Sequence, residues 1–375
     1  MNKNKKEIIK QTVPVLKEHG ETITTYFYQN MFKAHPELLN MFNQTNQKVG
    51  NQPKALANTV LKAAEHIDHL EVLTPAVIGI GHKHRALNVK PEHYPIVGEN
   101  LLIAIKEVLG EAATPEIMDA WEEYYGELAS VFIDVEEDMY EESAWEGFQE
   151  FKVTKKEQLS DDIVRFTVEN KNLPLDYRAG QYITVKVKPE HYPNEALRHY
   201  SICSADTSNG LQFAVKREGA GDTRGVVSNY MHDEVGEMDT IQISAPAGDF
   251  TVDQGHEKIL FVAGGVGATP IMAMAEEAAV NNVDAALLYS ALDESHQPFK
   301  EEMEALKNNM DVHVKLTHPD GFLVHDDFKD YLDREVYICG SMHFMDAMIN
   351  ILKDSGFEES NIHYEPFGPK MSLAG

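Results

Sequence analysis

The sequence predicts three domains in series: an all-α domain over residues 1–145, an antiparallel β-barrel over 146–254 and a doubly wound α/β domain over 255–375. Apolar residues recur every three or four positions in the first part, which is typical of helices. Short alternating strands with Gly, Asn and Asp between them follow, and then strands alternate with helices. A chain of 375 residues is also too long for a single ordinary core.

Composition and charge exclude several classes of function. The net charge of −28, from 33 basic and 61 acidic residues, argues against partners such as nucleic acid or anionic membranes, and its simplest role is solubility. The hydrophobic content of 43% is ordinary for a globular protein, and no apolar run is long enough for a signal peptide or a membrane span. Two cysteines, Cys203 and Cys339, do not suggest a disulfide framework, so we expect the cytoplasm.

The first helices can be placed from their apolar stripes and their punctuation. A first helix is expected to end at Gly20, because glycine often follows a helix. A second helix over residues 21–35 is expected to stop before Pro36. After a polar segment a helix resumes near Asn51, and it carries Gln52 one turn before Leu56 on the same face.

One histidine lies at a position where chemistry is plausible. Val77, Ile80 and His84 follow the 3–4 spacing of a helix, which predicts that His84 lies on its buried stripe. Pro91 suits a first helical position, and the stripe that follows it turns the hydroxyl of Tyr94 inward. Taken alone, a histidine on an apolar stripe is more often a hydrogen-bonded core residue than a metal ligand.

The last helix of the first domain places an acidic residue near the same region. It opens with the cap Thr114 followed by Pro115 and runs to about Tyr140. Glu136 falls four residues after the inward-facing Phe132, and so lies near the buried stripe. Glu136 is either one of several solvated acids at a helix end, or it turns inward to meet the imidazole and the tyrosine described above.

The sharpest motif of the second domain is Arg198-His199-Tyr200-Ser201 on a strand. Strand alternation places Arg198 and Tyr200 on one face and Ser201 on the other. An aromatic ring beside a cation suits a flavin, because the ring packs along the isoalloxazine and arginine binds the pyrophosphate. Ser228, which follows Gly225 at the start of a helix, could offer amides to a phosphate.

A glycine-rich loop opens the third domain. It directly follows a buried strand and precedes a helix opened by Pro270, which is the context that a dinucleotide-binding loop requires. Its candidate cofactor-binding residues are Gly265, Val266, Gly267, Ala268, Thr269 and Pro270. After the second strand, Asp293 and Glu294 supply acids and no arginine, which favours NADH over NADPH.

The helical pattern and the segment Gly81–Glu99 together resemble the globin domain of the bacterial flavohaemoglobins. The resemblance implies that His84 is the proximal ligand of a haem b iron and that Tyr94 and Glu136 are its proximal hydrogen-bonding partners. The residues that it implies for the distal face and the haem surroundings are Tyr28, Gln52, Phe42, Leu56 and Lys83. In this family Tyr28 would donate a hydrogen bond to bound dioxygen.

The later motifs, in their order, resemble the ferredoxin-reductase superfamily, which implies FAD in the barrel and NAD(P)H in the α/β domain. The implied FAD residues are Tyr182, Arg198, His199, Tyr200, Ser201 and Ser228. A C-terminal segment resembles the one whose aromatic covers the flavin, and it comprises Glu365, Pro366, Phe367, Gly368 and Pro369. The chain departs from the superfamily at Cys203, where many relatives carry a hydroxyl, and at Pro366, where cysteine is common.

This combination implies a nitric oxide dioxygenase that passes electrons from NAD(P)H through FAD to haem and converts nitric oxide to nitrate with dioxygen. Two alternatives stay open: an oxygen-binding or oxygen-sensing globin, and a flavin reductase of ferric iron or hydroperoxides. A full reductase module counts against oxygen storage, and the Tyr28–Gln52 pair favours dioxygen chemistry. The expected partners are therefore dioxygen, nitric oxide and NAD(P)H, and whether a hydrophobic ligand also enters the distal haem pocket stays open.

Overall fold

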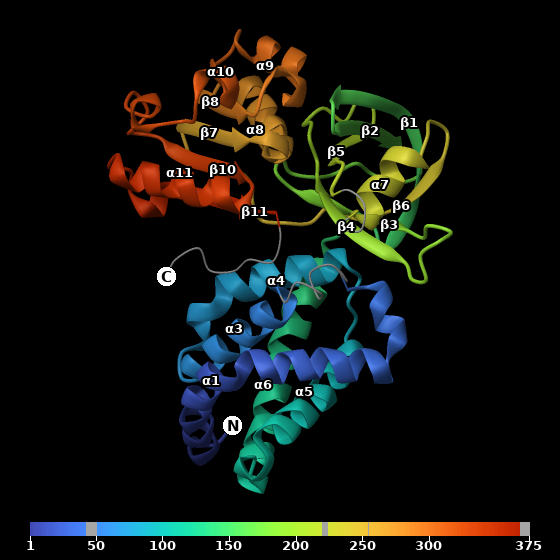
Figure 1. Ribbon diagram of the computed structural model, residues 1–375, viewed down its shortest axis with the longest axis vertical. Helices are drawn as coiled ribbons and strands as arrows, with labels where there is room; N and C mark the ends of the chain where they lie inside the picture. The colour runs from blue at the N-terminus through green and yellow to red at the C-terminus, as the bar shows by residue number, and fades with distance from the viewer. Residues whose placement is uncertain (43–50, 220–223, 254, 368–375) are drawn as a thin grey trace. The chain divides into compact units, whose positions relative to one another are not determined.

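The computed structural model describes residues 1–42, 51–219, 224–253 and 255–367. The chain divides into two compact units. One comprises Met1–Ser143 and Glu190–Leu197, and the other comprises Ala144–Pro189 and the described residues from Arg198 onward. Figure 1 shows the first unit as helical and the second as built on two sheets. Among the described residues, no helix is both long and apolar enough to cross a bilayer.

The helical unit contains α1 (Lys3–Ala34), α3 (Asn51–Glu65), α4 (Thr74–Ala86), α5 (His93–Leu109) and α6 (Pro115–Glu141). The last helix begins as predicted, since the Thr114 side chain accepts a hydrogen bond from the N–H of Ile117. The core of the helical unit contains large apolar side chains from α1, α5 and α6, among them Phe27, Ile105 and Trp121.

Two predicted helix boundaries are wrong. Helix α1 does not end at Gly20 but continues to Ala34, because Gly20 is buried where α3 packs closely. A Cβ atom at Gly20 would lie 3.5 Å from the Cβ of Ala57, so the glycine serves this close packing and not a helix end. Helix α5 begins at His93, two residues after Pro91, because the Lys90 N–H bonds the His93 ring and forms a turn there.

The first sheet has the strand order β4-β3-β6-β1-β2-β5. Its strands are β1 (Phe148–Ser160), β2 (Ile163–Glu169), β3 (Tyr182–Val187), β4 (Ala196–Ser201), β5 (Leu211–Lys216) and β6 (Thr240–Ser244), and α7 (Val226–Asp233) is its one longer helix in the described chain. The predicted closed barrel is wrong, because β4 and β5 are edge strands. In the part of the chain that the structure describes, an isolated bridge between Ile202 and Phe213 joins the two ends, and no continuous ladder runs round the sheet.

The second sheet has the order β11-β10-β7-β8-β9, and each pair of neighbouring strands is parallel. Its strands are β7 (Lys258–Gly264), β8 (Asp284–Ala291), β9 (Asp311–Leu316), β10 (Glu335–Gly340) and β11 (Ile362–Pro366), connected through α8 (Ala268–Val280), α9 (Lys300–Leu306), the short α10 (Thr317–Asp320) and α11 (Met342–Asp354). Phe261 packs with α8, whereas Leu260 and Val262 pack with α11 on the other face (Figure 1). The predicted doubly wound α/β domain is confirmed, and its strand order reverses between β7 and β10.

Candidate functional site

Three helices bring His84, Tyr94 and Glu136 together. The Nδ1 atom of His84 on α4 lies 2.6 Å from Oε1 of Glu136 on α6 and 3.1 Å from the Tyr94 hydroxyl on α5. The Tyr94 hydroxyl donates to the same Oε1 atom at 2.6 Å. Burial and then the Glu136 carboxylate raise the pKa of Tyr94, which keeps the hydroxyl protonated as a donor. The carboxylate therefore accepts one bond from the phenol and one from the Nδ1–H of the imidazole.

The His84 side chain is less enclosed than its stripe predicts. It is 33% exposed, whereas the Glu136 side chain is only 4% exposed. The buried residues of α4 are Gly81, Arg85 and Ala86, and a Cβ at Gly81 would contact Met139 of α6 at 3.1 Å. The face of α4 that packs against α6 thus differs from the predicted stripe, and His84 stays partly exposed.

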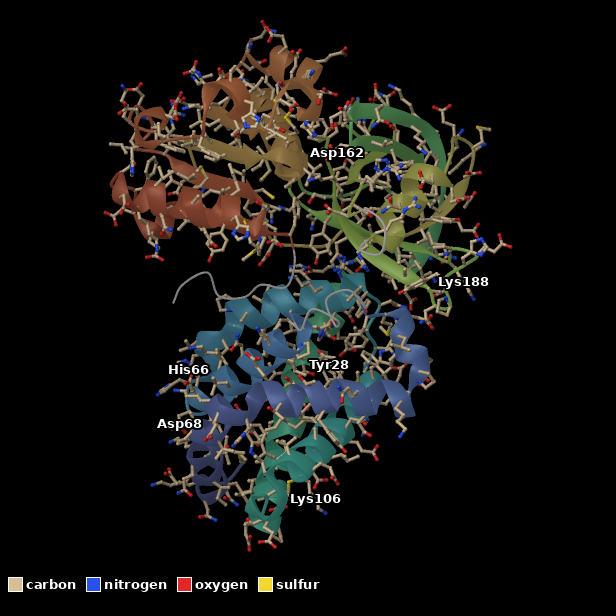
Figure 2. All side chains as sticks on the ribbon, viewed as in Figure 1. Tyr28, His66, Asp68, Lys106, Asp162 and Lys188 are labelled. Atoms are coloured by element: carbon tan, nitrogen blue, oxygen red, sulfur yellow. The ribbon has the colours of Figure 1, made fainter. Side chains whose placement is uncertain are left out.

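A second cluster on α1 and α3 contains the predicted distal residues. Tyr28, labelled in Figure 2, is 7% exposed, and its ring lies 5.8 Å from those of both Phe32 and Phe42. Burial raises the pKa of Tyr28, and the Gln52 amide offsets part of that rise, so the hydroxyl remains a donor. Leu56, one turn after Gln52, packs against the same core.

These residues fit a haem. Because Glu136 fixes the Nδ1–H tautomer, Nε2 of His84 keeps the lone pair that an iron ligand needs, and it makes no hydrogen bond among the described residues. The Oε1 atom of Gln52 is buried without a hydrogen-bond partner in the described chain, although Tyr28 lies close by. A buried amide oxygen without a partner, beside a protonated phenol, is suited to a small polar ligand. Lys83 precedes His84 on α4 and is half-buried.

The flavin motif lies on strand β4, as predicted. Arg198 and Tyr200 are half-buried, Ser201 is buried and His199 is exposed. The Tyr200 ring stacks on Phe213 at 5.8 Å, which fixes the plane of the phenol.

Side chains of the neighbouring strand β3 contact the flavin motif. His199 Nδ1 lies 2.8 Å from the hydroxyl of Thr184 on β3, and its ring is 4.8 Å from that of Tyr182. A Cβ at Gly248 would lie 2.8 Å from the Tyr182 ring, so this glycine leaves the space that the ring occupies. Aromatic rings held in place on the strand that carries Arg198 fit a flat, anionic dinucleotide such as FAD.

Ser228 lies in the first turn of α7, where its buried hydroxyl accepts the Glu218 N–H at 3.2 Å. A Cβ at Gly225 would lie 2.8 Å from that hydroxyl, so a side chain there would displace the start of the helix. The helix is preceded by Gly225, which supplies no side-chain cap, and its first amides remain suited to a phosphate.

The glycine-rich loop runs from β7 directly into α8. Gly265 has φ +55°, a conformation that favours glycine, and Tyr289 donates a hydrogen bond to its carbonyl at 3.2 Å. A Cβ at Gly267 would overlap the carbonyl oxygen of Cys339 on β10. Helix α8 begins at Ala268, two residues before Pro270, and has no side-chain cap. The Thr269 hydroxyl bonds the Val266 carbonyl at 3.0 Å, so the loop is held at the strand-order reversal.

The C-terminal motif is only partly described. Glu365 and Pro366 end β11, and Phe367, which follows them, is 41% exposed. Gly368 and Pro369 lie outside the described residues. Asp293, expected near a ribose, caps its own turn, where it accepts the N–H groups of Ser295 and His296.

Two residues beside the flavin strand and the nucleotide loop, Glu276 and Phe344, were not predicted from the sequence. Glu276 on α8 accepts hydrogen bonds from the Ser204 hydroxyl and the Ala205 N–H, each at 2.8 Å, just after the flavin strand. Desolvation raises the pKa of Glu276. Phe344 packs where Cβ atoms at Gly264 and Gly340 would lie, at 2.8 and 2.5 Å. Two adjacent acids interrupt the apolar stretch of residues 271–280, and this pattern could have indicated Glu276. No comparable pattern indicated Phe344.

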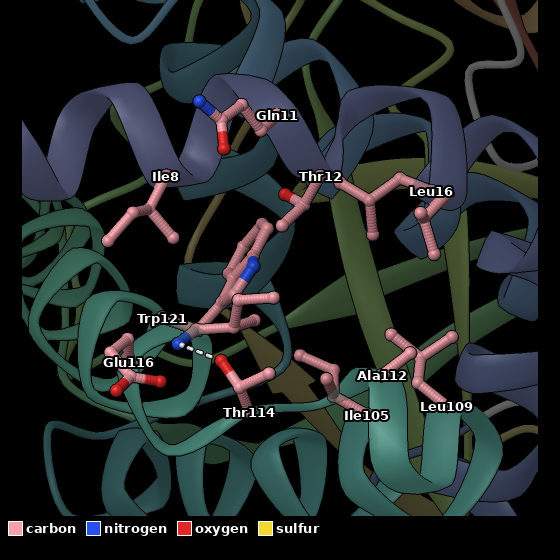
Figure 3. Close-up of a pocket in the computed structure, with 12 residues that line it drawn as sticks. Ile8, Gln11, Thr12, Leu16, Ile105, Leu109, Ala112, Thr114, Glu116 and Trp121 are labelled. Atoms are coloured by element: carbon pink, nitrogen blue, oxygen red, sulfur yellow. Dashed lines mark hydrogen bonds between the residues drawn. The ribbon is translucent and has the colours of Figure 1, made fainter.

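A cavity of about 380 Å³ lies elsewhere in the helical unit (Figure 3). Its lining includes Ile8, Leu16, Leu109 and Trp121, and it contains none of the predicted site residues. The predicted residues therefore lie elsewhere, among them the cluster of His84, the cluster of Tyr28, the flavin strand and the nucleotide loop.

Comparisons with known proteins agree with this division. The globin family model matches residues 25–132, and the oxidoreductase FAD-binding domain model matches residues 150–252. A flavohemoprotein of Halalkalibacterium halodurans is 42% identical, covering 100% of this chain and 98% of the relative.

Two solved structures are similar. The flavohemoglobin of Malassezia yamatoensis, with bound FAD and heme, has a TM-score of 0.88 at 26% identity and covers 98% of this chain and 99% of its own. The flavohem-like FAD/NAD-binding domain of a nitric oxide dioxygenase from Vibrio cholerae has a TM-score of 0.55 at 30% identity, covering 59% of this chain and 99% of its own.

Proposed function

The chain belongs to the flavohemoprotein family, and on that basis we propose that it is an NAD(P)H-dependent nitric oxide dioxygenase that carries haem b and FAD. When bound, NAD(P)H would supply a hydride, FAD would pass its two electrons on one at a time, and haem would supply the iron centre at which dioxygen and nitric oxide combine to nitrate. The observation that carries the proposal is the bonding of one carboxylate oxygen of Glu136 to both His84 and Tyr94. The proposed functional domains keep the boundaries 1–145, 146–254 and 255–375.

His84 is the proposed iron ligand, through Nε2. The negative charge of Glu136 on the Nδ1 side makes the imidazole a stronger electron donor, which stabilises oxidised iron and assists oxygen activation. Tyr94 holds the carboxylate in line by donating to the same oxygen. The two residues thus act on the iron only through His84.

Tyr28 and Gln52 are the proposed distal pair. The Tyr28 hydroxyl stays protonated in its buried position and is suited to donate a hydrogen bond to a diatomic ligand. The amide of Gln52 orients that hydroxyl, while Leu56 and Phe42 keep the surroundings apolar. The same apolar walls suit a hydrophobic ligand in the distal pocket, and dioxygen and nitric oxide are the proposed gaseous substrates.

Electron delivery rests on the second unit. Arg198 and Tyr200 are the proposed binding groups for the FAD pyrophosphate and ring, and Ser228 offers its helix start to phosphate. The amides that begin α8 are proposed to hold the nicotinamide dinucleotide. Both cysteines are buried and unpaired, which supports the cytoplasm as the proposed compartment.

Visible spectroscopy with NADH tests the proposal. The purified chain should show haem and flavin bands, and NADH in air should convert the haem bands to an oxy-ferrous form. Protein that purifies with FAD alone, after haem was supplied, would contradict the proposal and favour a flavin reductase. A stable oxy-ferrous form that does not react with nitric oxide would favour an oxygen-binding globin.

A further inference from the structure

Outside the cofactor sites, His256, Glu335 and His363 come together in the α/β part of the chain. One ligand atom from each residue lies within 4.8 Å of the others. All three side chains are partly exposed, so a cation could reach them from solvent. We propose that they form a binding site for a divalent transition metal of the zinc class, independent of the haem iron.

The sheet explains why two of the ligands share a face. Side chains alternate along a strand, so Glu335 and Tyr337 of β10 point to the same side. His363 of β11 pairs directly with Tyr337, and their rings stack with centroids 4.7 Å apart. His363 Nε2 already lies 2.9 Å from Oε2 of Glu335. A metal would take the place of the proton that joins these two atoms.

The third ligand comes from the segment that leads into β7. His256 Nδ1 lies 2.9 Å from the Tyr337 hydroxyl, which also accepts the Asp253 N–H at 3.3 Å. With Nδ1–H donating to that hydroxyl, Nε2 of His256 keeps its lone pair for a metal. A metal-bound histidine commonly donates its other N–H in this way. Tyr337 therefore supports the ligand without contacting the metal.

The chemistry of the set selects the class of cation. Two imidazoles and one carboxylate, with water as a fourth ligand, are a usual zinc set, whereas Ca²⁺ and Mg²⁺ prefer oxygen ligands alone. Tetrahedral bonds of about 2.1 Å place ligand atoms roughly 3.4 Å apart. The His363–Glu335 pair, at 2.9 Å, would therefore open slightly, and separations of up to 4.8 Å would close toward that value. The carboxylate of Asp253 adds negative charge near Tyr337, while Arg178 acts in the opposite sense.

The site lies away from the nucleotide loop. Glu335 is the first residue of β10 and Gly340 is the last, which separates the two ends by roughly 16 Å at about 3.3 Å per residue. A bound metal would tie the segment before β7 to β10 and β11. Its expected effect is to fix this connection to the sheet, and not to take part in hydride transfer.

Calorimetric titration of the haem- and FAD-loaded full chain with Zn²⁺, after chelator treatment, tests the site. The wild-type chain should bind with a component that weakens at least tenfold in His256→Ala and in His363→Phe. Phenylalanine keeps a ring against Tyr337, so this variant separates ligand loss from loss of packing. His313→Ala is the matched control, because His313 is exposed on β9 at the opposite edge of the same sheet.

Thermal unfolding and X-ray absorption provide independent readouts. Zn²⁺ should raise the midpoint of unfolding of the wild type and of His313→Ala, and not that of the two ligand variants. Absorption at the zinc edge should show two imidazole ligands with the remainder oxygen. Equal binding by all four proteins, or a single-imidazole zinc environment, would overturn the assignment.

Discussion

The Nδ1 atom of His84 lies 2.6 Å from Oε1 of Glu136, although the two residues are 52 positions apart in the chain. The Glu136 side chain is 4% exposed, so its charge is shielded from water and is directed at the imidazole. The strength of His84 as an electron donor should therefore depend on this carboxylate more than on any surface charge.

Glu136→Gln should lower the rate of nitric oxide consumption by about 10- to 100-fold while haem is retained, because the amide carries no charge to push electron density toward iron. The reduction potential of the haem should rise in the same variant. Glu137→Gln, the neighbouring exposed acid, is the control for α6. An unchanged potential in Glu136→Gln would show that the carboxylate only orients the ring.

His84→Ala should lose haem while keeping FAD, because His84 belongs to the helical unit and the flavin motif to the sheet unit. The ratio of haem to flavin absorbance in the purified protein measures this directly. His82→Ala, two positions away on the same helix, should keep both cofactors. Haem bound at wild-type affinity in His84→Ala would remove this residue from the iron.

Tyr28→Phe should release dioxygen about tenfold faster, which corresponds to the loss of about 1.4 kcal/mol, near the upper end for a neutral hydrogen bond. The removed hydroxyl is buried and protonated, so the substitution changes little else in the core. Stopped-flow displacement of dioxygen by carbon monoxide gives the rate. Tyr124→Phe removes another buried hydroxyl, the donor to the Ala63 carbonyl, and should leave that rate unchanged.

Gly267→Ala should destabilise the nucleotide loop by about 1–3 kcal/mol, because the new methyl group overlaps the Cys339 carbonyl. Reduction of FAD by NADH should slow, whereas reduction by dithionite should not. Gly126→Ala introduces the same methyl group into α6 with nothing within 4 Å, and there it should be neutral or slightly stabilising. Equal FAD reduction by NADH in Gly267→Ala and the wild type would contradict the assignment of this loop.

Glu276 should make stability depend on pH. Burial raises its pKa, so the folded chain binds the proton more readily than the unfolded chain. Its favourable contribution is present in acid and is lost as pH rises from the ordinary carboxyl range, about 4.3, through the raised value. Glu276→Gln stays neutral and still accepts from Ser204 and Ala205.

The unfolding midpoint of Glu276→Gln should therefore match that of the wild type in acid and exceed it increasingly toward neutral pH. Glu304→Gln, an exposed residue of the neighbouring α9, is the control. A midpoint difference that stays constant with pH would show that the Glu276 carboxyl is not held in its protonated form by burial.

The sequence predicted the elements whose signals are local. The cap at Thr114, the strand β4 and the glycine loop after β7 depend on signals within a few residues, and each lies where it was expected. The predicted end of the first helix was wrong because Gly20 allows α1 to pack against Ala57, which is a contact between separate helices. Local pattern contains no information on that contact.

The features that the sequence did not predict depend on contacts between residues far apart in the chain. Whether a sheet closes depends on β4 pairing with β5, and among the described residues their backbones are joined by an isolated bridge at Ile202–Phe213 and not by a ladder. The contact of Glu276 with Ser204 joins residues 72 apart in sequence. The inward turn of Glu136 was one of two readings open from the sequence, and only the packing of α4 against α6 decides between them.

The most direct test of the proposed function is the consumption of nitric oxide by the haem- and FAD-loaded chain, with nitrate and NADH measured in the same reaction. Nitric oxide loss should require both NADH and dioxygen, and about two nitrate ions should form for each NADH, because a hydride carries two electrons. Nitric oxide loss that persists without NADH, or that yields no nitrate, would contradict the proposed function.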